Sequence, residues 1–283
     1  MFVTLKLKNI VSVICILTIM SGFAIWVSAE AQGVEVPIIM YHSILKDNSA
    51  STEFIVTPSQ LEEDLKYIKE KGYTAVTVAD LIGYVYDNKP LPSKPIMLTF
   101  DDGHYNNYHY AYPLMKKYDM KMVVSVVGRY TDMFTEKDDS NPNYSYLTWE
   151  QIDEMQKSGF VEFQNHTYDL HSITAKRHGC KKNKGESLEE YKKVLTEDLT
   201  KLQNKLYDAT TVKPNAFTYP FGGISNASCD IIKELGFKAS FSCRDGVSVI
   251  TKDPECLYML KRCKRPSGES SKKFFDKILK SAD

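Results

Sequence analysis

The sequence has no excess of charge of either sign. Its 36 lysines and arginines balance 36 aspartates and glutamates over 283 residues, so the formal net charge at pH 7 is zero. A protein that holds nucleic acid through its overall field needs a strong positive balance, and we therefore expect no nucleic-acid partner. Internal repeats and low-complexity linkers are also lacking, and a hydrophobic fraction of 43% indicates a globular chain with a full core.

Paired metal-binding cysteines are lacking as well. Six cysteines occur, and no two of them form a CxxC pair. Cys15 lies in an N-terminal apolar segment, which leaves an odd number, so at least one thiol is expected to stay unpaired or to pair between chains. We interpret the remaining thiols mainly as buried or adventitious residues. They are Cys180, Cys229, Cys243, Cys256 and Cys263.

The first residues have the layout of an export signal. Lys6 and Lys8 precede an apolar stretch over residues 10–27, and residues 29–31 read Ala-Glu-Ala, a small-x-small cleavage site. The apolar stretch is also about as long as the roughly 18 residues of a membrane-spanning helix, which leaves a retained anchor open. Residues 1–31 are therefore predicted to be a signal peptide or a membrane anchor. The working domain is expected to be extracellular or in the cell envelope.

Strand-like and helix-like segments alternate along the rest of the chain. One helix is capped at Thr57 and stops at Gly72, and the longest begins at Ser187, with Glu190 completing a capping box and an apolar face that extends to Leu206. Strands are expected at residues 36–41, 73–77, 96–100, 122–127, 161–164, 216–219 and 239–242, and further helices at 79–86, 107–118, 148–159 and 228–235.

Repeated strand-helix units predict an α/β fold with a largely parallel sheet, either open and doubly wound or closed into a barrel. In both cases the chemistry belongs at the carboxyl ends of the strands. Residues 32–94 are expected to form the N-terminal strand-helix part of a single domain, and residues 95–283 its catalytic core. Residues 131–146, rich in Asp, Asn, Ser and Tyr, are expected to form one long surface loop that borders a binding groove.

Two adjacent carboxylates end the most informative strand. The apolar run of residues 96–100 stops at Asp101, Asp102 and a glycine. Adjacent side chains at a strand end point in different directions, so one carboxylate can bind a cation while its neighbour faces a bound water. That division is what metal-assisted hydrolysis requires. For the tripeptide Asp-Asp-Gly alone, an ordinary turn is the commoner explanation.

Two more strand ends carry suitable groups. His166 and His171 follow the strand at 161–164, five residues apart. On a helix that separation would turn the two side chains roughly 140° apart, so a shared metal site requires a loop, which the flanking sequence indicates. The turn at residues 218–223 contains proline and glycines, and its backbone N–H groups can face a pocket.

Together these segments resemble the polysaccharide deacetylases of carbohydrate esterase family four, the NodB-homology family, and most closely the branch that acts on poly-N-acetylglucosamine. The resemblance covers most of the chain. It rests on residues 37–43, on the Thr-Phe-Asp-Asp-Gly motif at 99–103 and on the His-Thr-Tyr-Asp-Leu-His segment at 166–171. It implies a single distorted (β/α) barrel of about seven parallel strands.

The resemblance also implies roles for single residues. Asp101 would be the general base, and the backbone N–H of Phe221 would stabilise the oxyanion. Asp102, His166 and His171 would hold a divalent metal, for which zinc is the default and cobalt, nickel, manganese or iron are open. The implied reaction removes N-acetyl groups from a polysaccharide that contains N-acetylglucosamine, either peptidoglycan or an exopolysaccharide, and releases acetate. The enzyme is expected to be a monomer close to the cell wall or membrane surface.

Two positions depart from the family pattern. Thr218 stands where much of the family has an arginine that orients the base. Arg262 stands at the usual position of the histidine general acid, and arginine is a poor proton donor at neutral pH. Protonation of the leaving amine is therefore left open between Asp101, returning its proton, and His42.

Two other functions are open from the sequence. A catalytically silent glycan-binding relative would fit the missing arginine and histidine. A non-haem iron oxygenase uses the same three ligand types, but such enzymes are usually built on antiparallel β-sandwiches, whereas this chain alternates strand with helix. Two further histidines, His104 and His109, follow the aspartate motif and are interpreted as groove-lining or surface residues, not as ligands.

Overall fold

A computed structural model describes residues 33–46, 53–175 and 177–279. The predicted signal or anchor at residues 1–31 lies outside these ranges. Within them, no helix has the length and apolar character needed to span a membrane.

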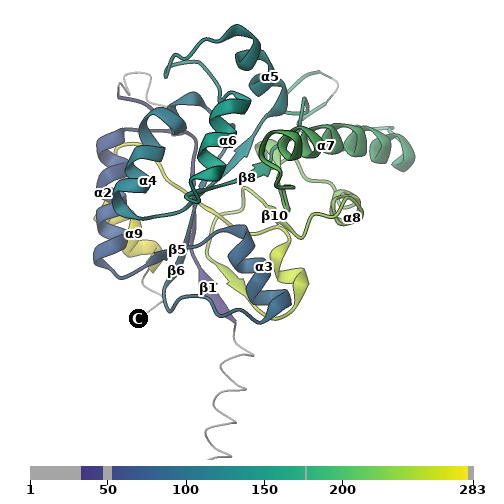
Figure 1. The fold of residues 1–283 in the computed structure, drawn as a ribbon. Helices are drawn as coiled ribbons and strands as arrows, with labels where there is room; N and C mark the ends of the chain where they lie inside the picture. Colours follow the sequence, from purple (N-terminus) through teal and green to yellow (C-terminus); the bar gives the residue numbers. More distant parts are fainter. Residues whose placement is uncertain (1–32, 47–52, 176, 280–283) are drawn as a thin grey trace, which may run out of the picture.

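A curled sheet of parallel strands forms the centre of the molecule (Figure 1). Its strand order is β10-β9-β8-β7-β6-β2-β12, and each neighbouring pair along this path is parallel. One further strand, β5 (Thr74–Ala75), pairs with the beginning of β6. In the order of the sheet, the strands are β10 (Ala239–Phe241), β9 (Ala216–Thr218), β8 (Val161–Asn165), β7 (Met122–Val126), β6 (Pro95–Phe100), β2 (Ile38–Tyr41) and β12 (Cys263–Lys264).

The two edges of this sheet meet through the segment that leads into β12. Phe241, at the end of β10, forms a parallel bridge with Leu260. The backbone N–H of Arg262 also donates to the carbonyl of Arg244 at 2.9 Å. Because β12 itself pairs with β2, the sheet curls into a distorted barrel. The expectation of a barrel of about seven parallel strands is confirmed, and the open doubly wound alternative is wrong.

Helices cover the barrel in two groups (Figure 1). On one side α2 packs against α4 and α9, and on the other α7 packs against α6 and α8. The caps expected at Thr57 and Ser187 are present, each accepting a hydrogen bond from a backbone N–H of the first turn. The six helices are α2 (Pro58–Glu70), α4 (Tyr112–Tyr118), α9 (Ser271–Ile278), α6 (Trp149–Lys157), α7 (Leu188–Thr210) and α8 (Ser228–Glu234); α3 (Val78–Asp87) lies apart from both groups.

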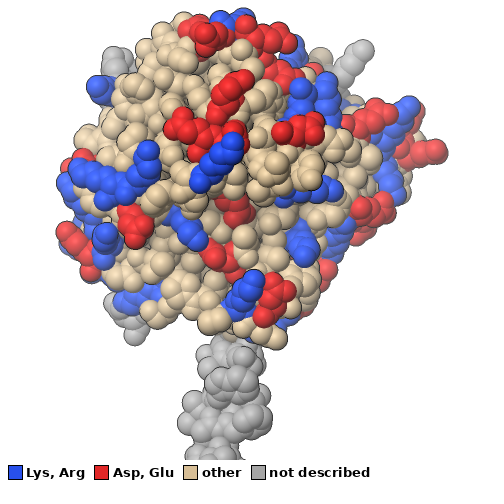
Figure 2. Space-filling model, viewed as in Figure 1, with Lys and Arg blue, Asp and Glu red and all other residues tan. Residues whose placement is uncertain are grey.

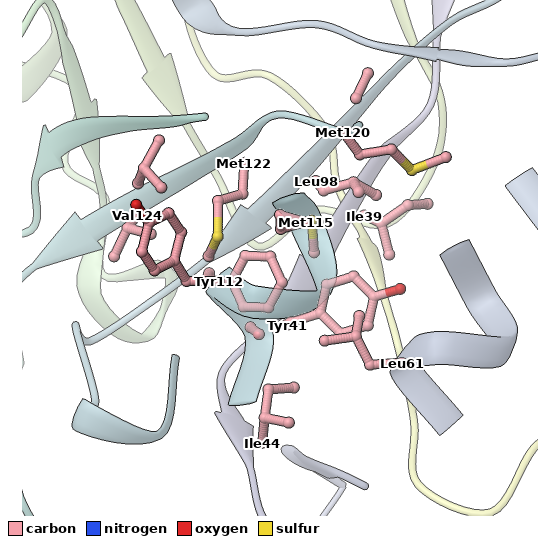
Figure 3. Close-up of a cluster of buried hydrophobic side chains, with 14 of the residues drawn as sticks. Ile39, Tyr41, Ile44, Leu61, Leu98, Tyr112, Met115, Met120, Met122 and Val124 are labelled. Carbon is pink, nitrogen blue, oxygen red and sulfur yellow. The ribbon is translucent and has the colours of Figure 1, made fainter. Parts of the chain in front are cut away.

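The central strands bury both of their faces. All six residues of β6 are buried, as expected for a parallel strand covered on both sides. Figure 3 shows one of the two faces, where Leu98 and Val124 meet Leu61 of α2 and Met115 of α4. Residues one position away along the strands, such as Met97, belong to a separate cluster that fills the opposite face.

The prediction of a surface loop over residues 131–146 is wrong for the first half of that range. A helix, α5 (Gly128–Lys137), occupies that region and ends at Asp138 in a left-handed conformation, with φ of 49°. Thr131 and Phe134 are buried on its inner side. Their helical spacing outweighs the polar composition, on which the loop prediction was based.

Two short strand pairs outside the main sheet have no counterpart among the predicted elements. β1 (Val34–Val36) pairs antiparallel with β11 (Ser248–Ile250). β3 (Ser43–Ile44) pairs in parallel with β4 (Ile55–Val56). Strands of two or three residues are too short to show a period in sequence. The second pair matters for function because it follows directly on His42.

The charged surface agrees with the neutral composition. Figure 2 shows lysine and arginine side chains interspersed with aspartate and glutamate side chains over the face seen in Figure 1. No extended area of one sign dominates this face. A field that would hold a polyanion is therefore lacking there, as the balance of charges predicts.

A fully buried ion pair ties α2 to the residues that follow β12. Arg265 donates from Nε and Nη2 to the two carboxylate oxygens of Asp64, at 2.8 and 2.9 Å. The hydroxyl of Tyr41 on β2 donates to the same carboxylate at 2.9 Å. The guanidinium of Arg265 also lies over the ring of Phe274 on α9, 4.7 Å from its centroid. This cluster joins two helices and the sheet beside the barrel seam.

Replacing Arg265 with methionine is expected to lower the free energy of unfolding by about 3–5 kcal/mol, because it leaves the Asp64 carboxylate buried without a counter-ion. The double variant Asp64→Asn with Arg265→Met removes both charges and is expected to recover much of that loss. Urea unfolding followed by circular dichroism measures both values. Equal losses in the single and double variants would show that the unpaired charge is not the cause.

Candidate metal and catalytic site

The chemically suited side chains meet at the carboxyl ends of the parallel strands. Asp101 and Asp102 follow β6, and His166 follows β8. Tyr41 of β2 is the register partner of Phe100 of β6, so the next residue on β2, His42, lies beside Asp101. This is the edge where ligands bind in parallel α/β folds.

Asp102, His166 and His171 form a compact group of possible ligands. One ligand atom from each lies within 4.8 Å of the other two. The Nε2 atoms of His171 and His166 are 3.1 and 3.5 Å from Oδ1 of Asp102. One carboxylate and two imidazoles form a donor set for zinc or a similar divalent cation, with positions left for water and substrate. The three residues predicted to share an ion are therefore brought together.

The backbone around His166 sets its ring for metal binding. Its Nδ1 lies 2.7 Å from the carbonyl oxygen of Thr218. A carbonyl only accepts, so Nδ1 carries a proton, and Nε2, on the side of Asp102, is the nitrogen that would bind a cation. Ligating histidines are commonly held by a second hydrogen bond of this kind. The chemistry of the site thus fits a bound cation.

Helix α7 holds the loop that carries the two histidines. Asp198 accepts hydrogen bonds from the backbone N–H groups of Tyr168 at 2.7 Å and Asp169 at 2.8 Å. Asn165 accepts from the N–H of Thr167, which has a φ of 75°. Burial raises the pKa of Asp198 to about 6. The loop is non-helical between the histidines, which is how side chains five residues apart reach one point.

Asp101 forms a bidentate ion pair with Arg262. Nη1 and Nη2 of the arginine donate to Oδ1 and Oδ2 at 2.7 and 2.8 Å, and its Nε donates to the carbonyl of Ser242 at 3.0 Å. The two residues are 2% and 1% exposed. Burial opposes the ionisation of Asp101, but the Arg262 guanidinium, with smaller contributions from His166 and His42, holds the pKa of Asp101 below its ordinary value. Asp101 is therefore an ionised acceptor with a fixed orientation.

Arg262 thus contacts the carboxylate predicted to be the base. Thr218, at the position where the family pattern has an arginine, is uncharged, and its hydroxyl is 2.7 Å from that of Ser125. Sequence reasoning placed Arg262 at the acid position without linking it to Asp101. Two departures from the family pattern could have revealed this contact. An arginine is absent at Thr218, and an arginine, Arg262, is present where a histidine is usual.

His42 is a second neighbour of Asp101. Its Nε2 lies 3.9 Å from Oδ2 of Asp101. Burial lowers the pKa of His42, although the nearby carboxylates of Asp101 and Asp102 act in the opposite direction. A lowered pKa favours the neutral imidazole at neutral pH, and the remaining N–H of a neutral imidazole is a weak acid.

His104 lies at the edge of the ligand group. Its Nε2 is 3.3 Å from Oδ2 of Asp102, the oxygen on the other side from the one that faces His166 and His171. Burial opposes ionisation of Asp102, but hydrogen bonds from His104, His166 and His171 hold its pKa well below the ordinary value. The predicted groove-lining place of His104 agrees with the structure, and its contact orients the carboxylate.

One pocket of about 760 Å³ connects these groups. Besides the ligand group, the Asp101–Arg262 pair, His42 and His104, it is lined by Phe221, which has a φ of 54° and an exposed ring. Cys243 also lines it. All five cysteines in the described ranges are free thiols, two of them buried and Cys243 exposed.

Replacing Asp198 with asparagine is expected to weaken zinc binding about 10- to 100-fold, because the loop that carries the histidines loses its charged acceptor. Calorimetric titration of the metal-free protein with zinc measures the dissociation constant. The matched control is Glu197→Gln, an exposed neighbour on α7, which should leave the constant unchanged. An unchanged constant in Asp198→Asn would show that the loop is held without this carboxylate.

Comparison with known proteins agrees with this geometry. The polysaccharide deacetylase family model matches residues 88–240. The poly-beta-1,6-N-acetyl-D-glucosamine N-deacetylase of Escherichia coli K12 is 27% identical over 229 residues, which cover 74% of this chain but only 34% of that relative. The protein of the same name from Staphylococcus aureus is 26% identical over 214 residues, 71% of this chain and 70% of its own length.

A solved structure shares the fold. The de-N-acetylase from Aggregatibacter actinomycetemcomitans superposes with a TM-score of 0.72 at 25% identity, over 86% of this chain and all of that one. The family match covers more than half of the chain and includes the strand ends that carry Asp101, Asp102, His166 and His171. The resemblance recognised in the motifs is therefore confirmed, and the chain belongs to the polysaccharide deacetylase family.

Proposed function

We propose that this protein is a metal-dependent hydrolase that removes N-acetyl groups from an N-acetylglucosamine polysaccharide and releases acetate. One observation carries the proposal. In a single pocket, a carboxylate fixed by Arg262 lies next to a second carboxylate that faces two imidazoles. The arrangement joins a proton acceptor to a cation-binding group, the two parts that metal-assisted amide hydrolysis requires.

The residues divide the work as follows. Asp102, His166 and His171 would hold a divalent cation, which supplies Lewis acidity toward the acetamido carbonyl and toward water. Asp101 accepts the proton of the attacking water. Before the reaction, Arg262 keeps the Asp101 carboxylate ionised and oriented. The backbone N–H of Phe221, on the pocket wall, donates to the developing oxyanion.

Asp101 also returns the proton to the leaving amine in this proposal. A carboxylic acid held beside a guanidinium gives up its proton readily, because the arginine stabilises the carboxylate that remains. Arg262 itself holds its protons too tightly to donate them. The lowered pKa of His42 favours its neutral form, which is a poor proton donor, so Asp101 is the better of the two donors that the sequence left open.

Zinc is the proposed metal, since a donor set of two imidazoles and one carboxylate is typical of catalytic zinc sites. Cobalt, nickel, manganese and iron accept the same ligands. Metal analysis of the protein purified without added metal identifies the ion that it takes up.

The substrate proposed is poly-β-1,6-N-acetylglucosamine, because the relatives named above bear that polymer in their names. Peptidoglycan carries the same acetamido group and is the alternative. The protein is further proposed to act outside the cell or in its envelope, as expected from the N-terminal signal. It is also proposed to act as a monomer.

The two rival functions have less support. A silent glycan-binding relative was suggested by the missing arginine and histidine, but Arg262 supplies beside Asp101 the positive charge that the missing arginine would supply. An iron oxygenase would share the ligand types, but the barrel of parallel strands and the family match both favour the hydrolase. Oxygen consumption with ferrous iron would reveal such an activity.

Acetate release by the purified protein tests the proposal directly. With added zinc, it is expected to release acetate from poly-β-1,6-N-acetylglucosamine faster than from peptidoglycan or chitin oligomers. A chelator should abolish the release, and re-addition of metal should restore it. Binding of acetylated oligomers without acetate release, with each metal supplied, would favour the silent relative.

Replacing Asp101 with asparagine is expected to abolish acetate release and to leave the bound metal per chain nearly unchanged, because Asp101 lies outside the ligand group. Mass spectrometry of the metal content accompanies the assay. Asp245→Asn, another carboxylate lining the pocket, is the matched control and should retain activity. Loss of metal together with activity in Asp101→Asn would show that the roles of the two aspartates are misassigned.

Replacing Arg262 with methionine is expected to move the acidic limb of the kcat/KM profile to higher pH. The guanidinium now holds the pKa of Asp101 down, and without it burial raises that pKa, so the base becomes protonated and inactive at a higher pH. Arg262→Lys keeps the charge without the planar fork and should fall between the two. An unmoved limb would mean that Arg262 does not control the ionisation of the base.

A further inference from the structure

The two histidines of the ligand group are held in different ways. The ring of His166 is oriented by a hydrogen bond to the carbonyl of Thr218. Among the described residues, the ring of His171 has no second hydrogen bond of that kind, so its position depends on the loop between the two histidines. Thr167 in that loop has a φ of 75°, which a β-branched residue rarely adopts. Contacts from outside the loop therefore have to hold this conformation.

The first turn of helix α5 holds one side of the loop. The backbone N–H of Gly128 donates to the carbonyl of Thr167 at 3.1 Å, and that of Arg129 donates to the carbonyl of Tyr168 at 2.8 Å. Val127, at the N-cap position, has no side chain that could cap the helix. The carbonyls of the loop thus satisfy N–H groups that a capping side chain would otherwise bind.

The side chain of Tyr168 is bound from three helices. Its hydroxyl donates to Oδ2 of Asp132 on α5 at 2.8 Å. The other oxygen of Asp132 accepts from Nε1 of Trp149 on α6 at 2.8 Å and from Nζ of Lys205 on α7 at 2.9 Å. The ammonium of Lys201 lies 3.6 Å from the ring centroid of Tyr168. Asp132 therefore joins the loop to α5, α6 and α7, which lie together in Figure 1.

The ring of Tyr168 also packs closely against the backbone of α5. A Cβ atom at Gly128 would lie 2.7 Å from Cδ2 of Tyr168 and 2.9 Å from Cδ1 of Leu202. A side chain at position 128 would therefore displace the ring. Tyr168 is not among the residues that line the pocket, so contact with a substrate does not explain this arrangement.

We propose that Tyr168, bound through its hydroxyl to Asp132, is a positioning residue that places His171 relative to His166 and so sets the affinity of the ligand group for a divalent cation. This inference rests on the metal site of the proposed function and extends it, because it gives a role to residues outside the pocket. In this role, Tyr168 and Asp132 contact neither the cation nor the substrate.

Calorimetric titration of the metal-free protein with zinc tests the positioning role. Tyr168→Phe keeps the ring and loses only the hydroxyl, and it is expected to raise the dissociation constant about 10-fold. Tyr108→Phe is the matched control, because it loses a similar hydrogen bond, from the Tyr108 hydroxyl to Glu154 at 2.8 Å. It should leave the dissociation constant unchanged. The two variants should unfold at similar urea concentrations, so that stability alone does not explain a difference in zinc affinity.

Further variants test whether Tyr168 acts through Asp132. Asp132→Ala is expected to weaken zinc binding at least as much as Tyr168→Phe. The double variant should bind zinc no more weakly than Asp132→Ala alone, because both changes remove the same hydrogen bond. Gly128→Ala, which places a methyl group against the ring, should weaken zinc binding although the hydroxyl of Tyr168 remains.

Two results would overturn the inference. One is an unchanged dissociation constant for zinc in both Tyr168→Phe and Gly128→Ala. The other is a loss in the double variant equal to the product of the two single losses, which would mean that Tyr168 and Asp132 act independently. A wild type that binds no divalent cation would refute the metal site and the positioning role together. A wild type that binds zinc but releases no acetate would refute the proposed function alone, and the dissociation constants of the variants would still decide the positioning role.

Discussion

The buried pairing of Asp101 with Arg262 is the constraint on which the site depends. An isolated carboxylate at that depth would be driven toward its neutral form, and a neutral acid cannot take a proton from water. The two parallel hydrogen bonds from the Arg262 guanidinium stabilise the charge of the Asp101 carboxylate and fix its orientation. The sheet supplies this contact because β12 pairs with β2 and β2 pairs with β6, so that only one strand separates Arg262 from Asp101. The strand order of the fold thus sets the ionisation of the proposed base.

The pair also shows how a charge that the family pattern places at one strand end can come from another. Thr218 is neutral where an arginine is common, and the positive charge comes from Arg262 on a different strand end. The net charge around Asp101 is kept while its source moves. Each of these two departures from the family pattern, considered alone, suggests a weakened enzyme. In the structure, the charge of Arg262 compensates for the charge that is absent at Thr218. Motif matching should therefore ask whether a missing charge is supplied from elsewhere in the pocket.

Local signals in the sequence predicted the helix caps at Thr57 and Ser187, the parallel strands and the strand ends that carry the proposed metal ligands. Each depends on a few consecutive residues with a known preference. Three features could not be obtained in this way. The contact of Arg262 with Asp101 joins residues 161 positions apart. The strands β3 and β4 are too short to show a hydrophobic period. The polar composition of α5 favours a loop, and its helical face is recognised only once the burial of Phe134 is known.

The seam of the barrel sets the partner of Asp101 apart from the proposed ion-binding group. All three proposed metal ligands lie in the middle of the chain, whereas the partner of the base lies on the strip that joins β10 to β12 and is held by a few backbone hydrogen bonds. Opening of that strip alone would leave the ion-binding group intact and the base without its counter-charge. The charge that fixes Asp101 therefore comes from a later part of the chain than any of the proposed ligands Asp102, His166 and His171.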